Sequence, residues 1–83
     1  MHRQLTLVTR EDCELCEHML ADLLALRVEL DLPVLVTLDV DSDPELLRRY
    51  ALKVPVLLLN GAPVFHGQLD VAEFKRLLRP ARF

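Results

Sequence analysis

Glycine, cysteine and long hydrophobic runs are all scarce in this sequence. Its longest apolar segment, residues 54–59, is far too short to cross a bilayer, so we expect no membrane partner. Only two glycines stand among 83 residues, and 52% of the residues are hydrophobic, which is typical of a folded chain and excludes a disordered tail. At this length we expect a single domain, spanning residues 1–83.

The chain also lacks a strong excess of charge of either sign. Ten Lys and Arg residues are interleaved with thirteen Asp and Glu residues, giving a net charge of −3. Because no basic face is available for a phosphate backbone, we expect no nucleic-acid partner. The short apolar run near the start breaks at Arg10 without a small-residue cleavage site, so we expect no signal peptide and a cytoplasmic location.

The two cysteines, Cys13 and Cys16, are separated by two residues. In the cytoplasm such a pair is more often redox-active or metal-binding than a structural crosslink. Closing so short a loop would also remove little entropy from the unfolded chain. Two inert, buried thiols are a further alternative, because free cysteine is among the most buried residue types.

Four segments have the apolar patterns of strands. They fall at residues 4–9, 34–38, 56–59 and 64–66. Residues 34–38 are nearly all apolar, which is typical of a strand covered on both faces of a sheet. Asn60 and Gly61 predict a tight hairpin turn between the last two strands.

Three helices are predicted between and after these strands. Asp12, Asp43 and Asp70 are each good N-caps, and Pro44 suits the first helical position. We expect the first helix to end before Pro33 and the last to run through Leu78 and stop at Pro80. Apolar residues three or four apart predict one buried stripe on the first helix, formed by Cys16, Met19, Leu20, Leu23, Leu26 and Leu30.

The resulting order, β-α-β-α-β-β-α, predicts an α/β fold. A four-stranded mixed sheet with helices on both faces closes such an order. We expect the aromatic residues Tyr50, Phe65 and Phe74 to lie in its core.

The cysteine pair falls where the first strand gives way to the first helix. Cys13 is expected in the first turn of the helix, where the positive end of the dipole favours a thiolate. Cys16 lies about one turn deeper and could resolve a mixed disulfide formed on Cys13. Acidic residues nearby oppose the thiolate unless water screens them, namely Glu11, Asp12, Glu14 and Glu17.

Metal binding remains an alternative for this pair. Zinc needs about four ligands, so His18, His66 or His2 would have to complete the site. An iron–sulfur cluster shared across a dimer is a related alternative. Asp39, after the second strand, is either a proton shuttle for the dithiol or a strand-end residue facing water, and His66 is either close to the site or exposed.

The chain resembles a glutaredoxin, of the thioredoxin-fold superfamily, in three segments: LTLVTREDCELC, LDVDSDPELLRRYALKVPVLLLNG and HGQLDVAEFKRLL. It is most similar to the small bacterial glutaredoxin-like proteins. The resemblance implies a thioredoxin-like fold and a thiol–disulfide oxidoreductase, with Cys13 as nucleophile and Cys16 as resolving thiol, acting in electron transfer and cell redox homeostasis. It implies protein or small-molecule disulfides as partners, with glutathione as a candidate co-substrate. We expect a monomer that holds no metal or cofactor.

The resemblance also assigns binding residues. Pro55 matches the proline whose preceding peptide bond is cis, so that Val54 presents its backbone to a substrate or to glutathione. Arg10 matches a basic residue that binds a glutathione carboxylate, although it could equally balance Glu11 and Asp12. Leu15, Gly67 and Asp70 correspond to residues that border the same groove.

Several motifs of the wider family are absent. Glu14 and Leu15 replace a Pro-Tyr pair, one glycine stands where glutaredoxins have two, and Leu69 replaces a polar residue. The chain also has no tryptophan, so the thioredoxin motif is missing. These departures weaken the expectation of glutathione binding. They leave open a non-catalytic thioredoxin-fold binding module, with or without a metal or an iron–sulfur cluster.

Overall fold

The computed structural model describes residues 3–79. Within them, the strands are β1 (Gln4–Thr9), β2 (Val34–Asp39), β3 (Val56–Leu59) and β4 (Ala62–His66). The helices are α1 (Glu14–Glu29), α2 (Pro44–Tyr50) and α3 (Val71–Leu78), and a one-turn 3-10 helix, η1 (Val40–Ser42), precedes α2. Pro80, expected to stop the last helix, and the predicted domain limits lie outside the described residues.

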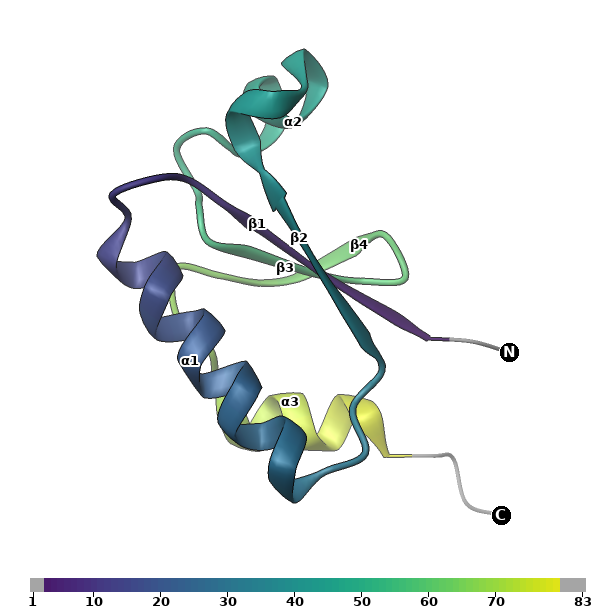
Figure 1. Cartoon of the computed structure of the whole chain (residues 1–83). Coiled ribbons are helices and arrows are strands. Elements are labelled where there is room, and N and C mark those ends of the chain that lie inside the picture. Colours follow the sequence, from purple (N-terminus) through teal and green to yellow (C-terminus); the bar gives the residue numbers. More distant parts are fainter. Residues whose placement is uncertain (1–2, 80–83) are drawn as a thin grey trace.

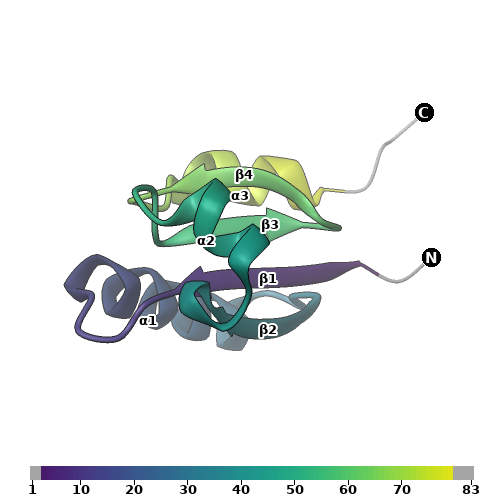
Figure 2. The ribbon, with the colours of Figure 1, turned by 90° about the horizontal axis from the view of Figure 1, so that it is seen from above.

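The four strands form one mixed sheet in the order β2-β1-β3-β4. β1 runs parallel to β2 and antiparallel to β3, and β3 and β4 form an antiparallel hairpin. Asn60 and Gly61 both have positive φ, as the tight hairpin turn requires. Figure 2 shows this order, with α2 in front of the sheet and α1 and α3 behind it. The mixed sheet predicted from the sequence is confirmed.

Two apolar clusters hold the helices to opposite faces of the sheet. On one face, Leu5, Leu7 and Leu57 pack with the buried stripe of α1 and with Phe74 of α3. On the other, Val8 and Val56 pack with residues that include Leu46 and Tyr50 of α2. Because side chains alternate along a strand, one set of strands supplies both clusters. Helices therefore cover both faces, as predicted (Figure 1).

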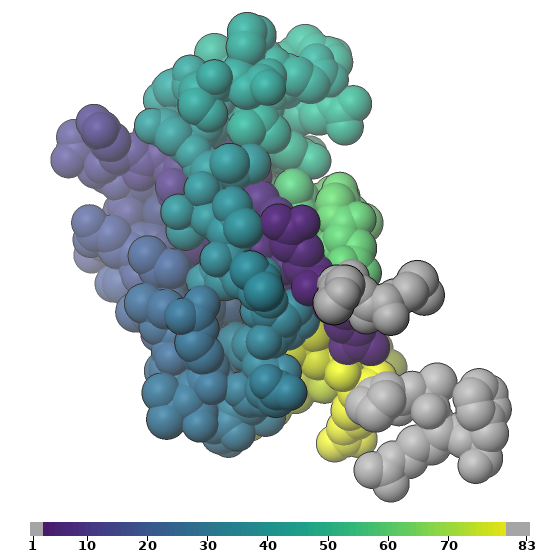
Figure 3. Space-filling view, turned by 45° about the vertical axis from the view of Figure 1, so that its right-hand side comes forward, coloured from purple at the N-terminus to yellow at the C-terminus, as the bar shows by residue number. Residues whose placement is uncertain are grey.

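The second strand was expected to be covered on both faces, and this prediction is wrong. β2 lies at the edge of the sheet, and Val34 remains 69% exposed while Leu35 packs against the core. In Figure 3, α2 covers only the upper end of the sheet face on which it packs. Side chains of β1 and β2 reach the surface below α2. An apolar run does not distinguish such a half-covered edge strand from a buried central one.

Of the three aromatic side chains expected in the core, Phe74 is buried most completely. It is 1% exposed and meets Phe65 edge to face, with ring centroids 6.2 Å apart. Phe65 and Tyr50 are half-buried. The expectation is therefore confirmed for Phe74, and the other two rings line the margins of the core.

Ion pairs on α2 lie at the surface. The guanidinium of Arg48 hydrogen-bonds the Glu45 carboxylate, and so does that of Arg49. These two bonds, the Arg48 bond more than the Arg49 bond, hold the pKa of the Glu45 carboxyl below its ordinary value. The bond between Arg49 and Glu45 also raises the pKa of Arg49. Pairs this exposed to water add little to stability.

Asp70 caps α3, and its loss gives a measurable prediction. Its carboxylate accepts a hydrogen bond of 3.0 Å from the backbone amide of Glu73. We expect Asp70→Ala to lower the free energy of unfolding by about 0.5–2 kcal/mol, because one helix amide loses its partner. Asp70→Asn, which can still cap, is the control in urea unfolding. Equal losses in both variants would contradict the capping role.

Candidate active site

The two cysteines form a disulfide where the chain passes from β1 into α1. Their Cα atoms are 5.2 Å apart, and no free cysteine remains in residues 3–79. The pair is thus described in its oxidised state. Only an attacking thiol or another reductant can open such a bond.

Cys13 caps α1, and the expectation that Asp12 would do so is wrong. Asp12 adopts a left-handed backbone with φ of 55°, whereas Cys13 is extended, as an N-cap is. The Cys13 sulfur accepts a hydrogen bond of 3.1 Å from the backbone amide of Cys16. Cys13 therefore stands one position before the first turn, where a helix amide points at its sulfur. This is the environment that favours a thiolate once the bond is reduced.

The two sulfurs differ in access to solvent. Cys13 is half-buried, and Cys16 is only 3% exposed within the core. The difference arises because Cys16 belongs to the buried stripe of α1 and Cys13 precedes the helix. A partner can therefore approach Cys13 more readily than Cys16.

The residues around the pair are acidic and open to water. The side chains of Glu11, Asp12, Glu14 and Glu17 are all exposed. Water and salt therefore screen their charges from the sulfurs. Leu15, between the cysteines, is 53% exposed, so an apolar side chain lies at the surface beside the pair.

A groove connects Leu15 to the turn between β4 and α3. It has a volume of about 230 Å³, and its walls include Leu15, His18, Asp22 and Gly67. The amide of Gly67 donates a 2.8 Å hydrogen bond to the carbonyl of Pro55. Leu15, Gly67 and Pro55, far apart in the sequence, are thus brought to one side of the cysteine pair.

The Val54–Pro55 peptide bond is cis, as the resemblance implied. Pro55 is buried and Val54 is half-buried. The amide of Val54 donates a 3.1 Å hydrogen bond to the carbonyl of Tyr50, so this amide is already engaged. Of the two backbone polar groups of Val54, the amide is therefore bonded within the chain.

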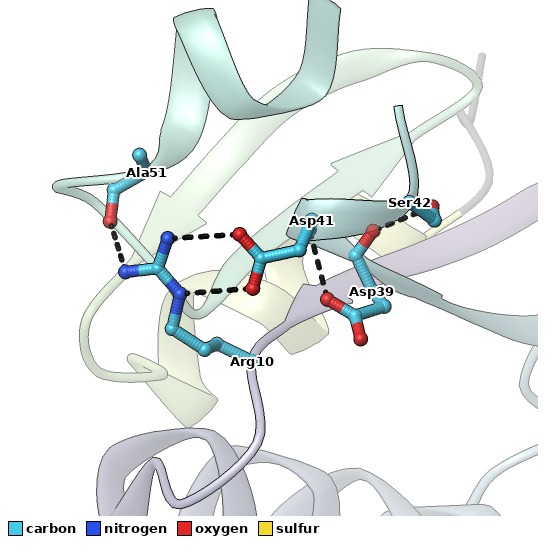
Figure 4. A network of polar contacts seen from close by, with 5 residues as sticks. All are labelled: Arg10, Asp39, Asp41, Ser42 and Ala51. Carbon is cyan, nitrogen blue, oxygen red and sulfur yellow. Dashed lines mark hydrogen bonds and ion pairs between the residues drawn. The ribbon is translucent and has the colours of Figure 1, made fainter. Parts of the chain in front are cut away.

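Arg10 joins three parts of the chain beside the cysteine pair (Figure 4). Its Nε and Nη2 atoms lie 3.4 and 3.3 Å from the two carboxylate oxygens of Asp41. Its Nη1 atom lies 3.4 Å from the carbonyl of Ala51. Within the described chain its ion-pair partner is therefore Asp41, and not Glu11 or Asp12.

Gly67 and Asp70, the remaining predicted binding residues, flank Leu69. Gly67 has φ of +76°, a conformation that favours glycine, although space is open around its Cα. Asp70 directs its carboxylate to the start of α3, as described above. Leu69, which replaces a polar residue of the wider family, is 8% exposed and belongs to the core.

The pairing of Arg10 with Asp41 was missed in the sequence, although its signal was present. Arg10 directly follows β1, Asp41 comes shortly after β2, and the two strands are parallel neighbours. Parallel strands end at the same edge of a sheet, so opposite charges after both ends can meet.

Asp39 is exposed and accepts a 2.8 Å hydrogen bond from the amide of Asp41, and His66 is exposed on β4.

Two searches of residues 3–79 gave negative results. No group of three or more His, Cys, Asp or Glu side chains is arranged to hold a metal ion there. Nor is any helix in this part of the chain both long and apolar enough to cross a membrane.

Comparison with known proteins gives one family and several related structures. A family model described as "Glutaredoxin-like domain (DUF836)" matches residues 4–79. The solution NMR structure of protein Ne2328 from Nitrosomonas europaea is 31% identical, covers 95% of this chain and 94% of that one, and has a TM-score of 0.82. The X-ray structure of the X. campestris protein XcR50 is 28% identical, covers 89% and 93%, and has a TM-score of 0.71.

A more distant similarity bears on the fold alone. Fasciola hepatica thioredoxin is 16% identical, with 92% of this chain and 78% of that one covered and a TM-score of 0.58. It supports the thioredoxin-like fold predicted from the sequence. No curated protein matches the chain significantly.

Proposed function

Since this chain belongs to the family of glutaredoxin-like domains, we propose that it is a thiol–disulfide oxidoreductase that cycles between a Cys13–Cys16 disulfide and the dithiol. One observation carries the proposal most strongly. The two cysteines are bonded at the start of α1, with the half-buried Cys13 at the N-cap and the buried Cys16 in the core. An accessible attacker and a sheltered resolver suit the two steps of exchange.

The reaction proceeds in two displacements. The Cys13 thiolate attacks one sulfur of a partner disulfide, and the other partner sulfur leaves as a thiolate that takes a proton from water. The Cys16 thiolate then attacks the Cys13 sulfur and releases the second partner thiol. Two electrons pass to the partner, and the protein is left with its Cys13–Cys16 disulfide. The helix amide directed at the Cys13 sulfur supports the first step because it stabilises the thiolate.

The surface beside Cys13 supports binding of an extended partner. Leu15 offers an apolar contact, and the groove between Leu15 and Gly67 lies next to it. The Val54 carbonyl offers a pairing point for a strand, since the Val54 amide is already bonded. Protein or small-molecule disulfides are the substrates of this proposal. Small thiols, glutathione among them, return the protein to the dithiol, and the cytoplasm supplies such reductants.

Turnover of a protein disulfide tests the proposed activity. Insulin is incubated with dithiothreitol, and precipitation of its reduced B chain is followed with and without the wild-type protein. We expect wild type to accelerate precipitation and a Cys13→Ser/Cys16→Ser variant to leave the dithiothreitol rate unchanged. A wild-type rate equal to that of the double variant would overturn the proposal.

A further inference from the structure

The cation beside the disulfide already holds a carboxylate. A guanidinium binds the two oxygens of a carboxylate through two parallel N–H groups, and Arg10 uses Nε and Nη2 in this way on Asp41. Its Nη1 atom contacts the Ala51 carbonyl. The edge of Arg10 formed by Nε and Nη2 is therefore occupied from within the chain.

Arg10 also lines a hollow together with one of the two cysteines, Cys16. This hollow of about 140 Å³ is lined by Arg10 and Cys16 together with Thr9, Glu17 and Leu20. Arg10 also precedes Cys13 by only three residues, so a small thiol that attacks the Cys13 sulfur comes near the guanidinium. A carboxylate on such a thiol would be drawn to Arg10, but it would find Asp41 there.

Asp41 is fixed in position by its own segment. Its amide donates a 2.8 Å hydrogen bond to the Asp39 carboxylate, and the Ser42 hydroxyl donates a 2.6 Å hydrogen bond to the Asp39 carbonyl. Figure 4 shows these bonds to the right of the Arg10–Asp41 pair. The backbone of Asp41 thus belongs to an ordered turn, from which its carboxylate reaches Arg10.

We propose that Asp41 is a specificity-determining residue that disfavours thiols carrying a carboxylate close to the sulfur, relative to neutral thiols. The inference rests on the proposed function, because it concerns the thiols that reduce the Cys13–Cys16 bond. In that step the small thiolate attacks the Cys13 sulfur, the bond to Cys16 breaks, and Cys16 leaves as a thiolate and takes a proton. A second small thiol attacks the mixed disulfide, so that two thiols are oxidised for each disulfide reduced.

The experiment compares 3-mercaptopropionate, which has a carboxylate, with neutral 2-mercaptoethanol. The second-order rate constant for reduction of the oxidised protein is measured with each thiol. For each variant, the rate constant with 3-mercaptopropionate is divided by that with 2-mercaptoethanol. The intrinsic reactivity of the two thiols cancels when this ratio is compared between variants. We expect Asp41→Asn to raise the ratio about two- to five-fold, the range that an exposed ion pair is worth.

Two further variants separate the contact from the net charge. Asp43→Asn removes one charge from the same region, but Asp43 bonds the amide of Glu45 and not Arg10. It should change the ratio much less. In an Arg10→Gln background, Asp41→Asn should no longer raise the ratio, because the guanidinium is absent.

The outcomes are distinct. A rise confined to Asp41→Asn and dependent on Arg10 supports the inference. No rise, an equal rise in Asp43→Asn, or a rise that persists without Arg10 overturns it. If 2-mercaptoethanol fails to reduce the disulfide in wild type, the proposed function itself fails, and the inference fails with it.

Discussion

Cys13→Ser is expected to abolish thiol–disulfide exchange, whereas Cys16→Ser should stop the reaction at a mixed disulfide. Serine cannot supply a thiolate, so we expect exchange with a disulfide substrate to fall by about a hundredfold or more in Cys13→Ser. In Cys16→Ser the accessible Cys13 still attacks, but no second thiol lies beside it to release the partner. The two variants therefore separate the attacking sulfur from the resolving one.

Intact mass spectrometry distinguishes these results. Each reduced variant is mixed with oxidised glutathione or a peptide disulfide, quenched with acid and weighed. Cys16→Ser should accumulate one adduct per chain within the time in which wild type turns over, and Cys13→Ser should show almost none. The reverse pattern would assign the attack to Cys16 and contradict the roles proposed above.

Phe74→Ala is expected to remove much of the stability of the domain. Phe74 is buried on α3 against Leu5 and Leu7 of the sheet and is in edge-to-face contact with Phe65. Truncating a buried phenylalanine costs about 3–5 kcal/mol through lost burial and the cavity left behind. A small domain is stable by only about 5–15 kcal/mol, so this loss brings the chain close to unfolding.

Urea unfolding followed by circular dichroism measures the loss. Leu77→Ala is the matched control on the same helix, because Leu77 is 39% exposed and is replaced by the same residue. We expect the control to lose far less stability than Phe74→Ala. Equal losses would show that the packing on Phe74 does not anchor α3.

The elements with local signals could be predicted from the sequence. Pro44 after a capping Asp43 starts α2, and Asn60-Gly61 makes the hairpin, because each acts through its own backbone geometry. The cysteine pair could be located at the start of a helix for the same reason. These signals require no knowledge of what packs against them.

The features that the sequence did not reveal depend on tertiary arrangement. The sequence predicts a buried strand where β2 lies, because an apolar run does not say which strand occupies the edge of the sheet. The N-cap of α1 is Cys13, one position after the predicted Asp12. Asp12 adopts a left-handed backbone conformation, which residue propensities do not predict. The partner of Arg10 depends on two loops that meet only when β1 and β2 pair.

The most direct test of the central claim is a redox titration of the cysteine pair. Wild type and Cys13→Ser are equilibrated across defined ratios of reduced and oxidised dithiothreitol and glutathione, trapped with a thiol reagent and weighed intact. The account predicts that wild type interconverts between two free thiols and one Cys13–Cys16 disulfide, with a midpoint roughly between −230 and −270 mV, near that of thioredoxin. Cysteines that never change state across the series, or a mass that carries metal after purification in reductant, would contradict an exchange function.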